Sequence, residues 1–240
     1  METISCNNLS IGYAEKVIQT GLSFSLNAGE VVCLLGRNGC GKSTLLRTLA
    51  GLLPVLDGTY KIGTTDAKDA QSAIALVLTE RLSLENTTVH DVVAMGRYPY
   101  TSFMGGLSPK DEQIILDALK DVGLEDIIYT PFNAHSDGEK QRVLIAKALA
   151  QATPLILLDE PTAHLDLPNR IHILKLLKRL ANEQQKTILI STHELDLACQ
   201  FSDRVLLMRK DGIELDTAEL LRGREAFTTA FGMDVFHPLD

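Results

Sequence analysis

A glycine-rich segment, GRNGCGKST at Gly36–Thr44, carries the clearest chemistry in the sequence. It matches the pattern G-x-x-x-x-G-K-[ST], in which glycines let backbone N–H groups turn towards phosphate oxygens. Lys42 would place its positive charge beside the β- and γ-phosphates of a bound nucleotide, and the hydroxyl of Ser43 would be a ligand for Mg²⁺. A nucleoside triphosphate, ATP with Mg²⁺, is the predicted ligand. The residues predicted to surround its phosphates are Gly36, Asn38, Gly39, Cys40, Gly41, Lys42, Ser43 and Thr44.

A pair of acidic residues at the end of a second apolar run supplies the other half of such a site. In LILLDE the strand pattern ends at Asp159, whose carboxylate can hold Mg²⁺, and Glu160 follows at once. Glu160 is the candidate to polarise a water molecule, since a general base must reach the proton that it removes. A lone Asp-Glu pair is more often a solvated turn. The buried strand before this pair and Pro161 after it favour the functional interpretation.

The stretch AHSDGEKQR, residues 134–142, has two interpretations. Ser136 with Glu139 fits the S-x-x-E capping box, which satisfies free backbone N–H groups at the start of a helix. The same N–H groups also make a ready anion site. On this stretch alone the capping interpretation is favoured, because such signals are common.

The hydrophobic pattern predicts the elements that must position these residues. Short β-rich runs come first, and a helix pattern follows the glycine-rich segment. From about residue 88 to residue 150 the chain is mostly helical, with Ser108 as an N-cap and Pro109 at the first helical position. The later runs PLILLDE and KTILIST suit strands buried on both faces. An α/β core with a mostly helical insertion at about residues 80–150 is therefore expected.

Composition limits the classes of protein that fit. The 240 residues have an ordinary hydrophobic content of 45%, and a net charge of −8 argues against a nucleic-acid partner. The four cysteines include no C-x-x-C pair, which fits a reducing, cytosolic setting better than a disulfide framework. The amino terminus lacks the layout of a secretion signal, and no apolar run approaches the ~18–20 residues that span a bilayer. A membrane role would therefore depend on a partner.

The order of these motifs resembles that of the ATP-binding cassette (ABC) ATPases, from about Ile4 to Asp203. In this resemblance Gly36–Thr44 is Walker A and Leu155–Asp159 is Walker B, with Glu160 as the catalytic carboxylate. The resemblance implies a P-loop NTPase fold: an α/β ABC-type ATPase core with an antiparallel β subdomain and an inserted helical subdomain. Within one ABC domain, residues 1–79 and 151–220 would form the core with the β subdomain. Residues 80–150 would form the helical signature subdomain, and residues 221–240 a short tail.

Three further residues have roles that only this resemblance implies. His193, in STHE, is at the position of the switch histidine, and it is expected to be catalytic with Glu160 and Lys42. Asp166, in AHLD, lies in the segment similar to the D-loop. Tyr13, in IGYAEKVI, matches the aromatic residue that stacks on adenine.

The stretch HSDGE at His135–Glu139 stands where ABC proteins carry the signature L-S-G-G-Q, and it retains Ser136 and Gly138. In the family this helix start faces the γ-phosphate bound by another subunit. The same residues would therefore both cap the helix and bind the anion. The resemblance therefore implies a head-to-tail pair of copies with two ATP molecules between them.

The chain departs from the family at two places. The signature has His135 for Leu, Asp137 for Gly and Glu139 for Gln, and the two acids bring negative charge towards a triphosphate unless their side chains turn away. Where the family carries the Q-loop glutamine, this chain has Thr79 and Glu80. Glu80 is the predicted replacement as a magnesium ligand, because Mg²⁺ favours hard oxygen ligands, and Thr79 is the alternative.

The segment VHDVVAMGRYPYTSFMGGLS resembles the insertion in ATPases of iron–siderophore, haem and vitamin B12 importers. Its residues Tyr98, Tyr100, Phe103 and Met104 form an apolar cluster beside Arg97. Such a patch often marks an interaction site, although these aromatic residues could equally form the small lobe's own core. The resemblance implies a separate transmembrane permease as a partner and, indirectly, a substrate-binding protein.

The expected function is thus ATP hydrolysis that powers uptake of an iron chelate or a cobalamin-like substrate, at the cytoplasmic face of the inner (plasma) membrane. The alternatives are a soluble ABC ATPase that acts on nucleic acid or the ribosome, and an ABC exporter ATPase. Copurification with a permease, with ribosomes or with DNA distinguishes transport from the soluble alternatives.

Overall fold

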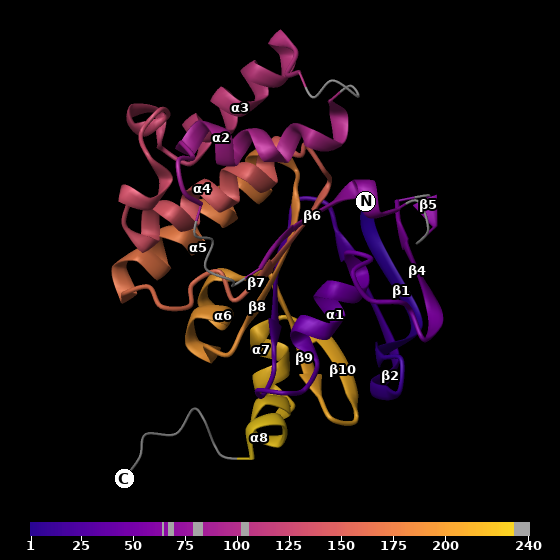
Figure 1. Cartoon of the computed structure of the whole chain (residues 1–240). Coiled ribbons are helices and arrows are strands. Elements are labelled where there is room, and N and C mark those ends of the chain that lie inside the picture. The colour runs from indigo at the N-terminus through magenta and orange to yellow at the C-terminus, as the bar shows by residue number, and fades with distance from the viewer. Residues whose placement is uncertain (64, 67–69, 79–83, 102–105, 233–240) are drawn as a thin grey trace.

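The computed structural model describes residues 1–63, 65–66, 70–78, 84–101 and 106–232. It contains two sheets and a helical lobe, which lies at the top of Figure 1. The first sheet is antiparallel, with the order β2-β1-β4-β5. Its strands are β1 (Glu2–Tyr13), β2 (Lys16–Asn27), β4 (Asp57–Ile62) and β5 (Thr65–Asp66).

The second sheet has the order β10-β9-β3-β8-β7-β6, and all of its pairs are parallel except β10 with β9. Its strands are β3 (Val31–Leu35), β6 (Ile74–Val77), β7 (Leu155–Asp159), β8 (Thr187–Thr192), β9 (Arg204–Arg209) and β10 (Gly212–Asp216). Every residue of β3, β7 and β8 is buried, as expected for strands covered on both faces. Because β8 lies between β3 and β7, the segments that follow these three parallel strands meet at one edge of the sheet.

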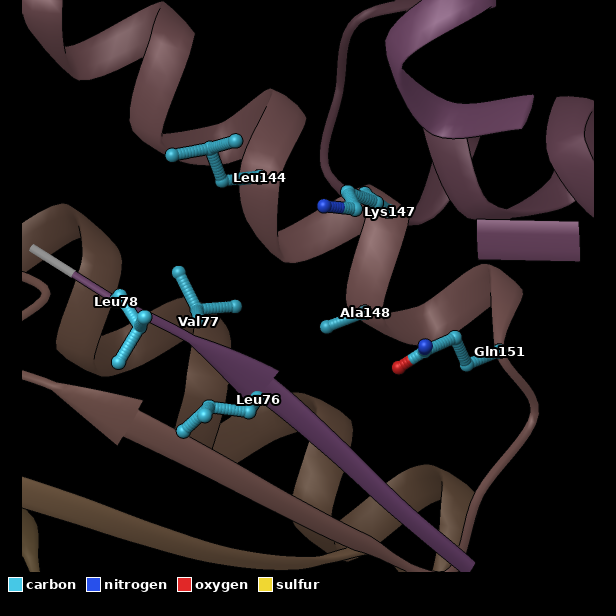
Figure 2. Close-up of a pocket in the computed structure, with 7 residues that line it drawn as sticks. All are labelled: Leu76, Val77, Leu78, Leu144, Lys147, Ala148 and Gln151. Carbon is cyan, nitrogen blue, oxygen red and sulfur yellow. The ribbon is translucent and has the colours of Figure 1, made fainter. Parts of the chain in front are cut away.

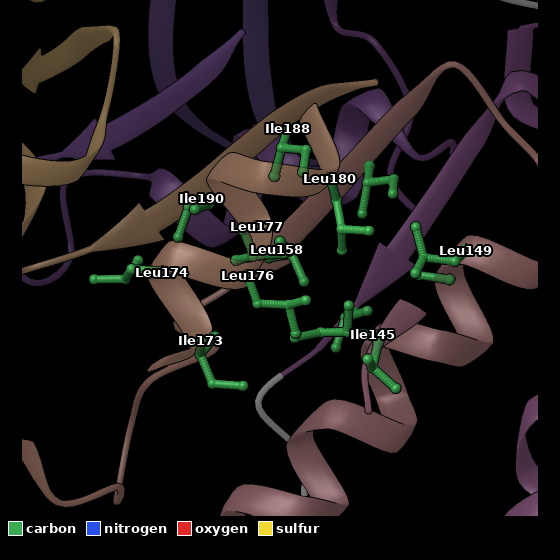
Figure 3. Close-up of a cluster of buried hydrophobic side chains, with 14 of the residues drawn as sticks. Ile145, Leu149, Leu158, Ile173, Leu174, Leu176, Leu177, Leu180, Ile188 and Ile190 are labelled. Atoms are coloured by element: carbon green, nitrogen blue, oxygen red, sulfur yellow. The ribbon is translucent and has the colours of Figure 1, made fainter. Parts of the chain in front are cut away.

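Two hydrophobic clusters cover the faces of the parallel sheet. One fills the space between the two sheets and includes the buried side of α1 (Lys42–Leu49). The other lies beneath α5 (Leu167–Gln184) and α6 (Leu195–Phe201), and it continues into the helical lobe. Figure 3 shows how leucines of α5, such as Leu177, meet Leu158 of β7 and the isoleucines of β8. The core and the lobe thus share one continuous apolar cluster.

Three helices of the helical lobe begin with capping boxes. Thr88, Ser108 and Ser136 each form a complete capping box with the acid three residues later. The predicted N-caps at Ser108 and Ser136 are therefore confirmed. The elements of the lobe are α2 (Val89–Ala94), η2 (Met95–Tyr100), α3 (Pro109–Asp121), η3 (Glu125–Ile127), η4 (Phe132–Ala134) and α4 (Asp137–Ala150), and η1 (Ala70–Ala73) precedes β6.

Arg97 ties three of these elements together from a buried position. Its guanidinium forms an ion pair with Asp111 of α3 at 2.9 Å, donates to the carbonyl of Ala150 at 2.7 Å and lies 4.1 Å from the ring centroid of Tyr100. The hydrogen bonds from Ser108, and then that from Arg97, hold the pKa of Asp111 at about 2. Gly96 packs against α4 so closely that a Cβ would lie 2.3 Å from the carbonyl oxygen of Lys147. The GRYPY stretch therefore sits directly on the end of α4.

The tyrosines of this stretch face outwards. Tyr98 is 59% exposed and Tyr100 is 48% exposed, so these two do not form the core of the lobe. That core is aliphatic, with Val92 and Ile115 among its fully buried members. Phe103 and Met104 lie outside the described residues.

The carboxy-terminal region packs against the core as far as the structure describes it. Helices α7 (Ala218–Gly223) and α8 (Ala226–Phe231) bury Leu221 and Phe227. The division of the chain into a core, a helical subdomain and a tail at residues 79, 150 and 220 stays a prediction.

Leu177→Ala tests the shared apolar cluster. Leu177 is fully buried, and removal of its side chain leaves a cavity that costs about 2–5 kcal/mol of unfolding free energy. Denaturant unfolding should show a lower midpoint with little change in slope. Glu183→Ala, at an exposed position of the same helix, is the control, and an equal loss in both variants would contradict this account.

Candidate active site

The phosphate loop joins β3 to α1 and depends on glycine at two points. Gly41 has φ +113° where α1 begins, a conformation that L side chains rarely adopt. A Cβ on Gly36 would lie 2.5 Å from the carbonyl oxygen of Met208. The loop thus lies tightly against β9, and its backbone N–H groups stand at the start of a helix, where anions bind.

Lys42 is buried and spans the loop. Its ammonium donates to the carbonyl of Gly36 at 2.8 Å and to that of Arg37 at 3.4 Å. Both acceptors are neutral, and a buried charge is stabilised fully only when it is paired. The ammonium therefore stands ready for a phosphate oxygen.

Gln19 supports the loop from the antiparallel sheet, and sequence analysis missed it. Its buried amide donates to the carbonyls of Cys40 at 3.0 Å and Arg209 at 2.6 Å. The alternation of β2 from its buried Leu22 would place Gln19 outwards. A register shift, in which Leu9 pairs with Leu22 but Ile11 pairs with Gln19, reverses that parity. The polar residue is thereby turned inwards. Gly21, which has φ +69° between these two pairs, is the signal in the sequence, because an isolated glycine inside a strand pattern suggests a bulge.

Ser43 and Asp159 converge as predicted. The hydroxyl of Ser43 donates to Asp159 Oδ1 at 3.0 Å, and Asp159 is buried at the end of β7. These two oxygen groups fit Mg²⁺, which is usually held by one or two carboxylates together with water and substrate phosphates. In the described part of the chain, no group of three or more His, Cys, Asp or Glu residues could form a metal cage. Glu80, the third predicted metal ligand, and its alternative Thr79 lie outside the described residues.

Ser191 connects the two acidic residues, and sequence analysis missed it as well. Its hydroxyl donates to Asp159 Oδ1 at 2.6 Å and accepts from the backbone N–H of Glu160 at 2.9 Å. Ser191 pairs with Asp159 in the register of β8 and β7. Its place two residues before the predicted switch histidine is the one signal that the sequence offers.

Glu160 and His193 lie together at the same edge of the sheet. Glu160 has φ +45°, an uncommon conformation for a non-glycine residue and a form of backbone strain that is concentrated at functional sites. Its Oε1 is 3.4 Å from His193 Nδ1. A half-buried carboxylate and an exposed imidazole are thus in contact beside the phosphate loop, where proton transfer would be needed.

Two predicted nucleotide contacts lie outside this network of bonds. Tyr13 is 47% exposed at the turn between β1 and β2, as a residue that stacks on a base would need to be. Asp166 serves as the N-cap of α5 and accepts from the N–H of Asn169 at 3.1 Å. Their contacts with nucleotide stay predictions.

In the altered signature, two residues at the start of α4, Ser136 and Glu139, are hydrogen-bonded to each other. The carboxylate of Glu139 accepts from the N–H of Ser136 at 3.0 Å and from its hydroxyl at 2.7 Å. These bonds, with a smaller contribution from His135 at 3.7 Å, lower the pKa of Glu139. The Glu139 side chain therefore faces Ser136. Asp137 occupies the first turn, where an acid is favourable to the helix dipole.

Gly138 is needed for packing as well as for any role in the signature. A Cβ at this position would lie 2.9 Å from the side-chain oxygen of Asn169 on α5. The helix that starts at Ser136 is therefore in direct contact with the first turn of α5.

The fold and the phosphate loop define a P-loop nucleotide-binding protein. The sequence profile of the ABC transporter family matches residues 19–163, so the chain belongs to that family. It is an ATP-binding subunit that hydrolyses ATP, and the expected α/β ABC fold with its two sheets and inserted helices is confirmed.

Iron-transport proteins are among the similar proteins. The iron(3+)-hydroxamate import ATP-binding protein FhuC of Bacillus subtilis is 39% identical over 215 residues, which are 88% of this chain and 80% of that protein. The ferric enterobactin transport ATP-binding protein FepC of Escherichia coli is 33% identical over 226 residues, 89% of this chain and 83% of that protein.

A solved structure also supports the assignment of this chain to the ABC transporter family. A transporter assigned to the metal-chelate type, in an inward-facing conformation, matches with a TM-score of 0.87 and 31% identity over 97% of this chain and 90% of that one. In the described part of the chain, no helix combines the length and the apolar character needed to cross a bilayer.

Ser191→Ala tests the link between the acidic residues. Loss of a hydrogen bond to a charged group costs about 1.5–3 kcal/mol, so kcat for ATP hydrolysis should fall roughly 10- to 100-fold. The Kd for ATP should change less, because Lys42 and the loop are untouched. Phosphate-release assays and nucleotide titration measure the two quantities. Ser25→Ala, on β2, is the control, and unchanged kcat in Ser191→Ala would remove Ser191 from the site.

Proposed function

We propose that this chain is the ATPase subunit of an importer and that it powers uptake of an iron chelate, such as a siderophore or haem, or of a cobalamin-like substrate. The observation that carries the proposal is the similarity to FhuC, an iron(3+)-hydroxamate import ATP-binding protein, over 88% of this chain. The complete phosphate loop, Asp159 and Glu160 supply the chemistry that such a subunit needs.

In the proposed mechanism, each residue at the sheet edge has one task. Lys42 neutralises the terminal phosphates, and Ser43 with Asp159 would hold Mg²⁺. Bound Mg²⁺ would supply positive charge to the phosphate oxygens. Glu160 orients and polarises the attacking water molecule, and the imidazole of His193, 3.4 Å away, supports its carboxylate.

A second copy of the chain completes each site in this proposal. The start of α4 at Ser136 faces the γ-phosphate held by the other copy, in a head-to-tail pair. Glu139 now occupies the hydroxyl and the N–H of Ser136 at 2.7 and 3.0 Å, so an incoming phosphate must displace or share these bonds. The lowered pKa of Glu139 means that its carboxylate is charged at neutral pH and repels the phosphate until it turns away.

A permease is the membrane partner in this proposal, and a groove between β6 and α4 is its proposed docking site. The groove has a volume of about 180 Å³, with Leu76, Val77 and Leu78 on the strand side (Figure 2). Leu144 and the half-buried Lys147 line the helix side, and burial lowers the pKa of Lys147. Apolar walls with one ammonium suit a short helix, whose last carbonyls can accept from that lysine. The subunit would thus lie peripherally at the cytoplasmic face of the membrane.

Glu160→Gln tests the proposed chemistry and the proposed function together. The variant should bind ATP normally, hydrolyse it about 100-fold more slowly or worse, and accumulate as an ATP-bound dimer. Phosphate release and gel filtration with ATP measure these effects, and Glu219→Gln, at an exposed site on α7, is the matched control.

Transport is measured in liposomes that contain this subunit and the permease encoded beside it. Wild-type protein should drive uptake of a ferric hydroxamate or another iron chelate, and Glu160→Gln should not. Copurification with ribosomes or DNA in place of a permease would overturn the proposed function, and outward movement of cargo would identify an exporter.

Leu144→Asp tests the docking groove. An unpaired carboxylate in an apolar contact should weaken permease binding roughly ten-fold or more. The isolated variant should retain its affinity for ATP, because Leu144 takes no part in the hydrogen bonds that Lys42 and Gln19 make in the phosphate loop. Leu220→Asp, at an exposed leucine of α7, is the control. Normal permease binding by a folded Leu144→Asp protein would place the docking site elsewhere.

A further inference from the structure

A basic groove lies where the helical lobe meets α5, and it shares no residue with the phosphate loop or with the pair Asp159 and Glu160. It has a volume of about 430 Å³, and Val122 and Leu176 contribute apolar surface to it. None of its described lining residues is Asp or Glu. Its basic side chains are Lys120, Arg142, His172, Lys175 and Arg179.

The concentration of positive charge runs against the balance of the whole chain, which has a net charge of −8. Within the described part of the chain, the side chains of Lys120, His172 and Lys175 have no hydrogen bond or ion pair with another residue. Like charges that share a groove repel one another, and an anion between them relieves this repulsion. These three side chains are exposed and free to reach a ligand.

The two arginines are held in place from behind. Arg142 Nη1 donates to the carbonyls of Val122 and Gly123, each at 3.1 Å, and Arg179 Nη2 donates to the carbonyl of Asp121. These bonds satisfy the carboxy-terminal carbonyls of α3. A guanidinium has five N–H donors, so each arginine keeps donors for an anion.

Two acidic residues near the groove, Asp121 and Glu139, accept hydrogen bonds from other side chains. The carboxylate of Asp121 accepts from Gln184 Nε2 at 2.6 Å. Glu139 is bound by Ser136, and Arg142 makes only the smallest of the contributions that lower its pKa. Neither carboxylate lines the groove, so its described lining carries basic side chains and no acid.

We propose that this basic groove binds a small multivalent anion that carries two or more phosphate or carboxylate groups. Its volume lies in the range of roughly 300–1,000 Å³ that is typical of small-molecule sites. Arginines pinned in a fixed orientation favour planar, bidentate contacts with such groups, and the two lysines add mobile point charges.

Because of the position of the groove, its ligand would connect the helical lobe to α5. Lys120 and Arg142 belong to the helical lobe, whereas Lys175 and Arg179 belong to α5. An anion held between them links the lobe to the helix that contacts Gly138 through Asn169. ATP turnover should therefore respond to the anion without competition at the phosphate loop.

The first test is a lysine-protection experiment on the full-length protein. Saturating Mg·ADP fills the phosphate loop, inorganic pyrophosphate or citrate is added, and an amine-reactive reagent labels the lysines for mass spectrometry. Lys120 and Lys175 should be protected, whereas Lys110, at the opposite end of α3, should not. Equal labelling with and without the anion, or equal protection of all three lysines, would overturn the proposal.

The second test compares affinities by calorimetry under the same conditions. A unit charge ~4 Å from an anion in water contributes roughly a five-fold change in binding constant. The double variant Lys120→Ala/Lys175→Ala should therefore bind pyrophosphate about 20-fold more weakly, and it leaves the arginines that cap α3 intact. Lys110→Ala is the control. Unchanged affinity, or lysine-dependent binding to anionic phosphatidylglycerol vesicles without binding of either small anion, would refute the small-anion site.

Discussion

The hydroxyl of Ser191 is the contact on which the geometry of the active site depends. Its oxygen atom donates to Asp159 and accepts from the N–H of Glu160, which also donates to the backbone carbonyl of Ser191 at 3.2 Å, so the neighbouring strand holds both acidic residues. Glu160 keeps its uncommon φ of +45° while its N–H is satisfied in this way. The arrangement needs β7 and β8 in register, which in turn needs both faces of the sheet to be covered.

The two hydrophobic clusters supply that cover. The antiparallel sheet and α1 bury one face, and α5, α6 and the helical lobe bury the other. Because the strands are held from both sides, the phosphate loop, Asp159 and His193 all leave the sheet at one edge. The positions of Gln19 and Gly36 show that the loop is shaped from outside as well, by β2 and β9.

Sequence patterns predicted the elements and the phosphate contacts better than they predicted the supporting residues. Continuous apolar runs and capping signals are local, so β7, β8 and the starts of α3 and α4 could be placed without a structure. Ser191 and Gln19 could not, since each acts across strands that are distant in the chain. In the signature, the S-x-x-E pattern predicted the bond between Glu139 and Ser136, because a capping box is also a local signal. The aliphatic core of the lobe and its outward-facing tyrosines depend instead on how η2 packs against α4.

The buried Arg97 fixes the position of one end of α4. It fastens the segment that carries Tyr98 and Tyr100 to the last carbonyl of α4, and Gly96 leaves no side chain between the two backbones. The opposite end of α4, about 20 Å away at ~1.5 Å per residue over its 14 residues, is the start at Ser136. The helix thus links the Arg97 contact at one end to the capped turn at Ser136 at the other. Because Arg97 and Gly96 hold the two backbones in direct contact, a displacement of the segment that carries the tyrosines would move the whole helix with it.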